Sequence, residues 1–474
     1  MSQKRKSSDA APRGYRRGAL SLSFAMSVAI LGAGAAASPV STSTSGKGPP
    51  PGSSDYVARD VQNMLAAHGR QTAPDGQLND PEYQIELAQE LAAGGVAEEA
   101  PFRYGKWNGV RGQFQSVSFK DRGGSDFSGR IYAPRAGATN PDTGTALNAP
   151  FPGVVVESGD GSLHQFYAWA AEDLAERGYV VLAFTVAGSQ NAMHYFTGLQ
   201  DAINFFWSTP SAPYAGGGID AFNPYWKLFD RSPDQSPVTT GRPYRFAVLG
   251  HSLGAFVASV VGNMDARVSA IVAWDKLIKN NSYFTIGFDP GNWKPTIPAL
   301  AVQSEYFATA TPYTIGCFLV FGCEAYDPTT GPPPARELST GYGGRDGWGI
   351  VHGDKTGGWV ASGVDVMVLV PRSSTHEEYL DQPYAPASRY GQALTSYYQT
   401  AWLDKYLKHD PTADARLAAT AFRQLEPKGR GVWGYTPLLQ RDDLLSFYFC
   451  SAWRYHAADG SLVQTNDAIG VGCS

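Results

Sequence analysis

Charged side chains are scarce in this sequence, and neither sign dominates. They make up 17% of the residues, and the formal net charge is −5 at pH 7. A protein that binds nucleic acid mainly through its phosphates needs a clear basic surplus. The composition therefore argues against a nucleic-acid partner.

Long apolar runs are missing after the first forty residues, so we expect no membrane span in the mature chain. Residues 1–37 have the parts of an export signal: a basic leader, the apolar run Ala19–Ile30, and small residues at Ala35–Ala37 for cleavage. The alternative is an uncleaved membrane anchor, which the shortness of the apolar run disfavours. We expect a signal peptide at 1–37, a flexible Ser/Gly/Pro linker at 38–54, and a secreted or periplasmic protein.

Cysteine is rare, with four residues that all lie in the last third of the chain. Their spacing does not match a zinc site, and the sequence has no metal motif, phosphate-binding glycine loop or internal repeat. We therefore expect no metal and no cofactor. In an exported protein we expect two local disulfides, Cys317–Cys323 and Cys450–Cys473, although two other pairings, or four free thiols, are the alternatives.

What the sequence does contain is one Gly-x-Ser-x-Gly pattern, Gly-His-Ser-Leu-Gly at residues 250–254. The apolar run Phe246–Leu249 precedes it, and apolar residues at helical spacing follow it up to Met264. A strand, this pentapeptide and a helix make the context of a nucleophile elbow, in which a strained turn lifts the serine hydroxyl above a sheet. Ser252 is therefore the candidate nucleophile; the alternative is a purely structural turn.

Apolar runs of strand length alternate with amphipathic stretches of helix length along the chain. The expected strands are 114–120, 130–133, 153–157, 179–185, 245–249, 268–274, 299–303 and 364–370, and the expected helices are 163–177, 197–207, 253–264 and 390–407. The first two strands form an antiparallel hairpin. Continuous apolar strands separated by helices indicate a mostly parallel sheet that is covered on both faces.

A hairpin, a parallel sheet and an elbow after the fifth strand follow one another in the order of the α/β-hydrolase fold. Residues 110–410 resemble secreted α/β-hydrolases of the dienelactone-hydrolase and platelet-activating-factor-acetylhydrolase-like group. The segments that carry the resemblance are Tyr167–Phe184, Gly250–Gly254, Ile271–Asp275 and Ser373–Tyr379. We expect an α/β fold with a mostly parallel eight-stranded sheet flanked by helices, a helical extension at 55–109 and a β-rich extension at 411–474 packed on the domain.

The sequence has eight histidines, and their places relative to the expected strands leave only one candidate for the general base. His376 follows the last expected strand by a short loop, where the fold places its catalytic histidine, and it comes after the serine and the acid. An imidazole titrates near neutrality, so it can take the serine proton and return it to the leaving group. His251, inside the elbow, is expected to point away from the nucleophile.

Two carboxylates qualify as the acid that orients this histidine, because each ends a strand at the required edge. Asp275 ends the run from Ile271, and Glu305 ends the following apolar run. The resemblance favours the later position and so Glu305, although the group more often has aspartate there. Asp275 remains the alternative, and Asp365 is excluded because it opens its strand at the opposite edge.

The resemblance also implies an oxyanion hole. Its donors are the backbone N–H of Leu253 and that of Asp160, in the loop 157–161 after the third strand. A carboxylate at this place departs from the group. It would oppose a developing oxyanion unless the side chain turns outward, toward Arg122 or solvent.

Two long segments, 209–243 and 306–359, interrupt the pattern and are rich in proline, glycine and aromatic residues. We expect both to project over the serine and to shape an apolar pocket. Its predicted lining is Tyr214, Phe222, Tyr225 and Trp226. Ordinary surface packing is the alternative.

Together these features predict a secreted serine hydrolase that cleaves carboxylic esters through a Ser252–His376–acid triad and an acyl-enzyme intermediate. Its substrate would be a small-molecule or lipid-like ester. The alternatives are a peptidase or acyltransferase of the same fold, and a non-catalytic binding protein on a hydrolase scaffold.

Overall fold

The computed structural model describes residues 107–470 except 110, 187–191, 236–240, 276, 279–293, 305–313, 319–321, 326–357, 373, 375, 381–390, 430–431, 437 and 447–448. Only the backbone is described at 192, 314–318, 322–325, 425–429 and 432–434. The predicted signal peptide, the linker and nearly all of the helical extension therefore lie outside the described residues.

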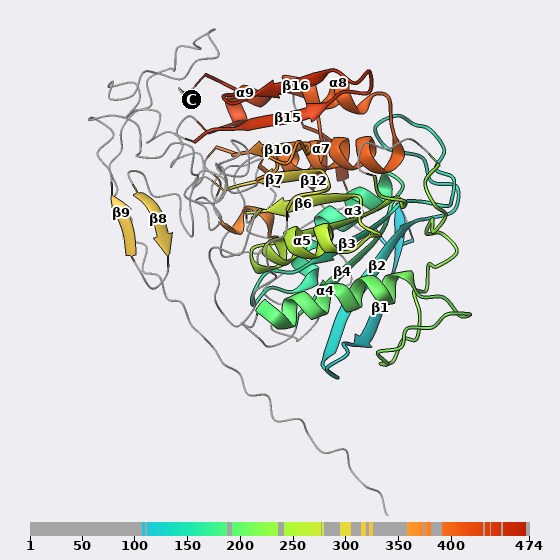
Figure 1. Ribbon diagram of the computed structural model, residues 1–474. Helices are drawn as coiled ribbons and strands as arrows, with labels where there is room; N and C mark the ends of the chain where they lie inside the picture. The colour runs from blue at the N-terminus through green and yellow to red at the C-terminus, as the bar shows by residue number, and fades with distance from the viewer. Residues whose placement is uncertain are drawn as a thin grey trace, which may run out of the picture. The chain divides into compact units, whose positions relative to one another are not determined.

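A ten-stranded sheet in the order β1-β2-β4-β3-β5-β6-β7-β10-β15-β16 runs through this part of the chain (Figure 1). The five pairings from β4 across to β10 are parallel, and antiparallel pairings flank them on both sides. The strands are β1 (Gly112–Lys120), β2 (Asp126–Pro134), β3 (Gly153–Glu157), β4 (Val180–Thr185), β5 (Phe246–His251), β6 (Ala270–Trp274), β7 (Ala299–Val302), β10 (Val366–Leu369), β15 (Ala452–His456) and β16 (Leu462–Thr465). Because the six central strands are parallel, their carboxyl ends meet at one edge of the sheet.

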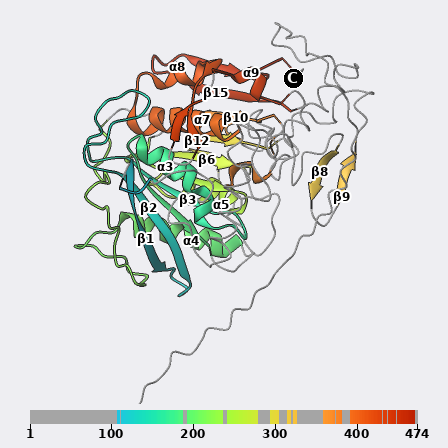
Figure 2. The ribbon, with the colours of Figure 1, turned by 180° about the vertical axis from the view of Figure 1, so that it is seen from behind.

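Helices cover both faces of the sheet (Figures 1 and 2). α4 (Ala192–Trp207) and α5 (Leu253–Met264) contribute to one buried apolar cluster, and α3 (Ala168–Glu176) and α7 (Gly391–Leu403) to the other. Strand β4 supplies both: Leu182 faces the first cluster and Val181 the second. A strand buried on both faces has no polar side to present, which explains its continuous apolar sequence.

Shorter elements complete the described chain. They are the 3-10 helices η2 (His164–Tyr167) and η3 (His376–Tyr379), the π-helical turn η4 (Asp404–Lys408), helices α8 (Ala413–Ala418) and α9 (Arg441–Leu444), and strands β8 (Thr314–Phe318), β9 (Gly322–Ala325), β11 (Ala421–Phe422), β12 (Leu425–Gly429), β13 (Val432–Tyr435) and β14 (Leu439–Gln440). β8–β9, β11–β14 and β12–β13 form three separate two-stranded sheets.

The predicted α/β architecture, with a large and mostly parallel sheet between helices, is confirmed. The predicted number of eight strands is wrong, because the C-terminal segment adds two more to the same sheet. β15 pairs antiparallel with β10, with Val366 opposite Arg454, and β16 pairs with β15. The segment that we expected to pack on the domain therefore continues its sheet.

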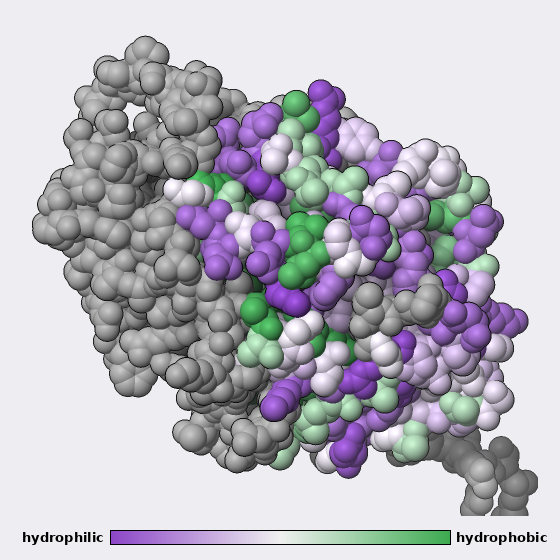
Figure 3. Space-filling model, turned by 45° about the horizontal axis from the view of Figure 1, so that its top comes forward, coloured by the Kyte–Doolittle hydropathy of each residue, from purple (hydrophilic) through white to green (hydrophobic). Residues whose placement is uncertain are grey.

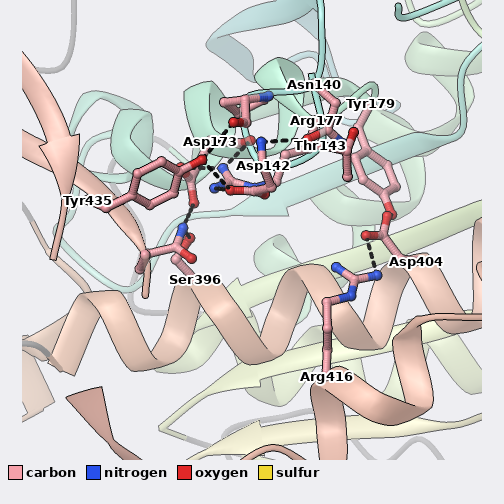
Figure 4. A network of polar contacts seen from close by, with 12 residues as sticks. Asn140, Asp142, Thr143, Asp173, Arg177, Tyr179, Ser396, Asp404, Arg416 and Tyr435 are labelled. Atoms are coloured by element: carbon pink, nitrogen blue, oxygen red, sulfur yellow. Dashed lines mark hydrogen bonds and ion pairs between the residues drawn. The ribbon is translucent and has the colours of Figure 1, made fainter. Parts of the chain in front are cut away.

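A buried polar network joins the loop before β3 to helix α3 and to the turn after α7 (Figure 4). The guanidinium of Arg177 is 1% exposed and forms ion pairs with Asp173 at 2.7 Å and Asp142 at 2.6 Å. Two residues further on, the hydroxyl of Tyr179 donates to Asp404 Oδ1 at 2.6 Å. These contacts lie where β4 begins, which is the edge of the sheet opposite to the carboxyl ends of the parallel strands.

Apolar side chains on the surface stand in small groups among hydrophilic ones on the face that Figure 3 shows. Large exposed apolar residues include Leu163, Met193 and Ile219. Within the described ranges, no helix has both the length and the apolar character needed to cross a membrane.

Candidate active site

Ser252 stands on a strained turn between β5 and α5. Its φ is 55° and its ψ is −120°, a backbone conformation that residues other than glycine rarely adopt. A Cβ at Gly250 would lie 2.4 Å from the carbonyl group of Gly254, and a Cβ at Gly254 would lie 2.7 Å from the carbonyl oxygens of Glu157 and Ser158. The turn thus needs glycine on both sides of the serine.

His376, the first residue of η3, lies between Ser252 and Asp275. Its Nε2 is 3.0 Å from Ser252 Oγ, and its Nδ1 is 2.6 Å from Asp275 Oδ2. A carboxylate can only accept, so Nδ1 carries the proton and Nε2 presents a lone pair to the serine hydroxyl. This tautomer is the one that a general base for Ser252 requires.

Asp275 is held as an anion in a fully buried position after β6. Burial alone would raise the pKa of its carboxyl group, but hydrogen bonds and charge from His376, with hydrogen bonds from Ser304, bring the pKa below its usual value. The amide of Ser304 donates to Oδ1 at 2.9 Å, and its hydroxyl donates to Oδ2 at 2.6 Å.

The carboxylate in contact with His376 is therefore that of Asp275, whereas the sequence led us to favour Glu305. Glu305 lies outside the described residues. β6 and β7 are parallel neighbours whose carboxyl ends meet at the same edge of the sheet, so the local sequence pattern does not separate the two candidate acids. β6 adjoins β5 directly, which brings Asp275 closer than the end of β7 to the turn that carries Ser252.

The loop after β3 packs against the nucleophile. A Cβ at Gly159 would lie 3.1 Å from Ser252 Cβ and 2.8 Å from His251 Nδ1. Within the described residues, neither the amide of Asp160 nor that of Leu253, the first residue of α5, donates to another group of the chain. Both predicted oxyanion donors are thus on segments that border Ser252, and one of them is at a helix N-terminus, where partial positive charge gathers.

The side chain of Asp160 is exposed and does not reach Arg122. Arg122 pairs instead with Asp201 at 2.8 Å. Although Asp160 is exposed, loss of solvent around its carboxyl group raises the pKa of that group, and the Tyr195 hydroxyl donates to Oδ1 at 3.3 Å.

His251 has no described hydrogen bond with Ser252, and its ring lies 4.6 Å from that of His376, centroid to centroid. Its ring lies between the Tyr167 hydroxyl and the backbone carbonyl of His376. Burial first, and then the nearby His376, lower the pKa of His251 to about 3, so its imidazole is neutral at physiological pH. No sequence pattern indicates that Tyr167 contacts His251, because Tyr167 lies in an ordinary amphipathic segment.

None of the four residues predicted to line a pocket in 209–243 has a described contact with Ser252, His376 or Asp275, and their lining role stays a prediction. This segment connects the end of α4 to the start of β5, at the opposite end of β5 from Ser252. Tyr225 and Phe229 are buried, and Phe229 packs on Phe246, the first residue of β5. Tyr214 packs 6.0 Å from Phe119 and donates to the Lys120 carbonyl.

The two remaining lining candidates follow the same segment. Phe222 is half-buried beside Asn223, whose side-chain amide donates to the carbonyl of Phe206 in the last turn of α4. Trp226 has Lys227 and Arg231 over its ring, 5.4 Å from its centroid in both cases. An open cleft of about 580 Å³, lined by Tyr214, Trp207 and Arg122 among others, lies on this side of the molecule and away from the triad.

Most of the second segment, 306–359, lies outside the described residues. At its end Trp359 is buried and donates to the Ile297 carbonyl. Cys450 is disulfide-bonded, whereas Cys473 and the side chains of Cys317 and Cys323 lie outside the described part of the chain. In that described part, no three His, Cys, Asp or Glu side chains stand together as a metal site, and the expectation of no cofactor stays a prediction.

Comparisons with known proteins add little to this geometry. The sequence matches no protein-family model, and it matches no curated protein. Among solved structures it is similar to a hypothetical protein of Pseudomonas aeruginosa, at 18% identity and a TM-score of 0.26. The match covers 36% of this chain and 46% of that one, so the chain spans under half of the neighbour's length, and we draw nothing from it.

Proposed function

We propose that this chain is a serine hydrolase of the α/β-hydrolase fold that cleaves carboxylic esters through an acyl-enzyme intermediate. The observation that carries the proposal is the line of contacts from Ser252 through His376 to Asp275, at 3.0 Å and 2.6 Å. Nucleophile, base and orienting acid within hydrogen-bond reach are the arrangement that activates a serine hydroxyl.

The strand order supports the hydrolase fold. An antiparallel hairpin, β1–β2, leads into a parallel sheet in which β3 has crossed to the far side of β4. The nucleophile follows β5 at the carboxyl edge, on a turn that needs both glycines. The acid follows β6 and the histidine follows β10, in the chain order serine, acid, histidine.

In the first half-reaction Ser252 Oγ attacks the ester carbonyl carbon while His376 Nε2 takes its proton. Asp275 stabilises the imidazolium that results, because its carboxylate faces Nδ1. The negative charge that develops on the carbonyl oxygen would be met by the amides of Leu253 and Asp160. The tetrahedral adduct collapses when His376 returns the proton to the leaving alcohol.

The second half-reaction repeats these steps with water. His376 takes a proton from the attacking water, the same amides receive the oxyanion, and Ser252 leaves with the proton as the acid is released.

We also propose that the enzyme acts outside the cytoplasm, because residues 1–37 have the parts of an export signal.

Active-site labelling with a fluorophosphonate, followed by peptide mass mapping, tests the proposal most directly. We expect stoichiometric modification of Ser252 in the wild type, none in Ser252→Ala, and at least a hundredfold slower labelling in His376→Ala. Ser259→Ala is the matched control, because Ser259 is a buried serine of α5 that donates to the Ala255 carbonyl.

Folded wild-type protein that takes up no label would refute the proposal and leave a non-catalytic binding protein as the better reading. A labelled protein that hydrolyses 4-nitrophenyl butyrate would support ester cleavage. A labelled protein that transfers the acyl group to added alcohols or amines faster than to water would instead identify an acyltransferase.

A further inference from the structure

Three hydrogen bonds form a continuous chain behind Ser252. The amide of Gly159 donates to the Tyr167 hydroxyl oxygen at 2.9 Å. The same oxygen lies 2.9 Å from His251 Nδ1, and His251 Nε2 lies 2.8 Å from the carbonyl oxygen of His376. Tyr167 and His251 are both buried.

The direction of each bond in this chain is fixed. The His376 carbonyl can only accept, so His251 Nε2 carries the ring proton. The neutral imidazole then offers a lone pair at Nδ1, so the Tyr167 O–H must donate to it. The Tyr167 oxygen is left to accept from Gly159, and every group in the chain has the partner it needs.

The chain joins the three parts of the proposed machinery that must keep their relative positions. Gly159 precedes Asp160, a proposed oxyanion donor, and packs against Ser252. His251 immediately precedes Ser252 on the elbow. The far end holds the backbone of His376, the proposed base.

We propose that Tyr167 and His251 are positioning residues that set the distance between the oxyanion loop and the catalytic histidine. This inference rests on the proposed function. Neither side chain has a described contact with Ser252, although the ring of His251 lies 4.6 Å from that of His376, centroid to centroid. They act through the backbone of Gly159 at one end and that of His376 at the other, and a displacement of about 1 Å at either end costs about a hundredfold in rate.

Tyr195 fixes the same loop from the other side. Its hydroxyl lies 3.3 Å from the Gly159 carbonyl oxygen and 3.3 Å from Asp160 Oδ1, so its one proton is shared between two acceptors of this loop. That carbonyl and the Asp160 N–H belong to one planar trans peptide, so they point in opposite directions. Because the Gly159 carbonyl faces Tyr195 on α4, the Asp160 N–H of the same peptide points away from α4. The N–H of Gly159 itself donates to the Tyr167 hydroxyl.

The test compares Tyr167→Phe and His251→Phe with His251→Gln, whose amide keeps one donor and one acceptor. Tyr179→Phe is the matched control, because it removes a fully buried hydroxyl at the other edge of the sheet. The assay measures hydrolysis of 4-nitrophenyl butyrate and the rate of fluorophosphonate labelling. Near-UV circular dichroism and thermal unfolding establish that each variant is folded at the assay temperature.

We expect Tyr167→Phe and His251→Phe to lower kcat by about ten- to a hundredfold, because the reacting groups lose their alignment. KM should stay within about twofold in both variants, and the acidic midpoint of the pH profile should stay in place in Tyr167→Phe. His251→Gln should recover most of the loss. The double variant Tyr167→Phe/His251→Phe should lose no more than the worse single variant, since both break one chain.

A Tyr167→Phe variant as active as Tyr179→Phe, in a wild-type background that labels at Ser252, would overturn the inference and leave the proposed function standing. Equal losses in His251→Gln and His251→Phe would also count against it. Failure of the wild type itself to label refutes the proposed function instead, so the two failures are distinguishable.

Discussion

Asp275 is ionised where a carboxylate would otherwise be neutral, and the donors that keep it so come from two different loops. His376 approaches one oxygen and Ser304 contacts both, so the buried charge is fully hydrogen-bonded. A buried carboxylate with this many donors is stable as an anion, whereas an unpaired one takes up a proton. The arrangement makes Asp275 the acid of the proposed triad.

We therefore expect Asp275→Asn to lower kcat by about a thousandfold or more with little change in stability. An amide at this place can donate to Nδ1, which moves the ring proton to Nε2 and removes the acceptor that Ser252 needs. Glu305→Gln is the paired variant and should retain most of the activity. The measurement is kcat for steady-state hydrolysis of 4-nitrophenyl butyrate by both variants. A larger loss of kcat in Glu305→Gln than in Asp275→Asn would identify Glu305 as the acid.

At the residue scale, the sequence was sufficient where a local pattern or the chain order decides. Ser252 stands in a pentapeptide with its strand and helix, and His376 stands after the last strand of the parallel sheet. The choice between Asp275 and Glu305 depends on the conformations of the loops after β6 and β7 at the carboxyl edge of the sheet. A local sequence pattern does not predict those conformations. The roles inferred for Tyr167 and His251 depend on contacts between residues 84 positions apart in the chain.

The elbow shows why one element cannot shift without its neighbours. The first turn of α5 packs so closely on the end of β3 that Gly254 faces two backbone carbonyl oxygens. Backbone atoms cannot rotate away as a side chain does, so a methyl group there must push the helix and the strand apart. That movement would separate Leu253 from the oxyanion loop.

Gly254→Ala should accordingly cost about 1–3 kcal/mol of unfolding free energy and lower kcat by about tenfold or more. Gly262→Ala, on the same helix, is the control. A Cβ there would lie 2.7 Å from a side-chain atom of Ile271, so it crowds the core and leaves the elbow alone. We expect it to lose stability without a matching loss of kcat, as measured by urea unfolding and ester hydrolysis. Equal kcat losses in both variants would contradict the assignment.

The element order also bears on the place of residues 209–243. Residues 209–243 follow a helix and precede a strand, and such connections return to the amino edge of a parallel sheet. Only the connections from a strand to the next helix lie at the carboxyl edge with the nucleophile. Aromatic composition favours a pocket wall in this segment, but the chain order places its end at the amino edge, where Phe229 packs on Phe246.

At the scale of the whole molecule, the C-terminal segment is part of the fold that supports the site. β15 pairs with β10, the strand that leads to His376, and the Ser451 hydroxyl accepts from the Val370 amide beyond the end of β10. At the opposite edge, Gln424 donates to Asp173, which is also the partner of Arg177. The sequence indicated a β-rich tail, but strand pairing over such a separation is set by the tertiary fold.

Arg177 is the residue on which the far edge of this assembly depends. Arg177→Met keeps the length of the side chain but leaves Asp173, which is 2% exposed, with a buried and uncompensated charge. We expect a loss of about 3–5 kcal/mol of unfolding free energy, since removing one partner of a buried ion pair costs far more than the pair contributes. Lys120→Met breaks the ion pair with Asp126, whose side chains are 41% and 72% exposed, and should cost at most about 1 kcal/mol. Urea unfolding measures both changes, and kcat should be unaltered in the fraction that remains folded, because neither residue approaches Ser252. A loss at Arg177 no larger than that at Lys120 would mean that the network in Figure 4 does not stabilise the fold.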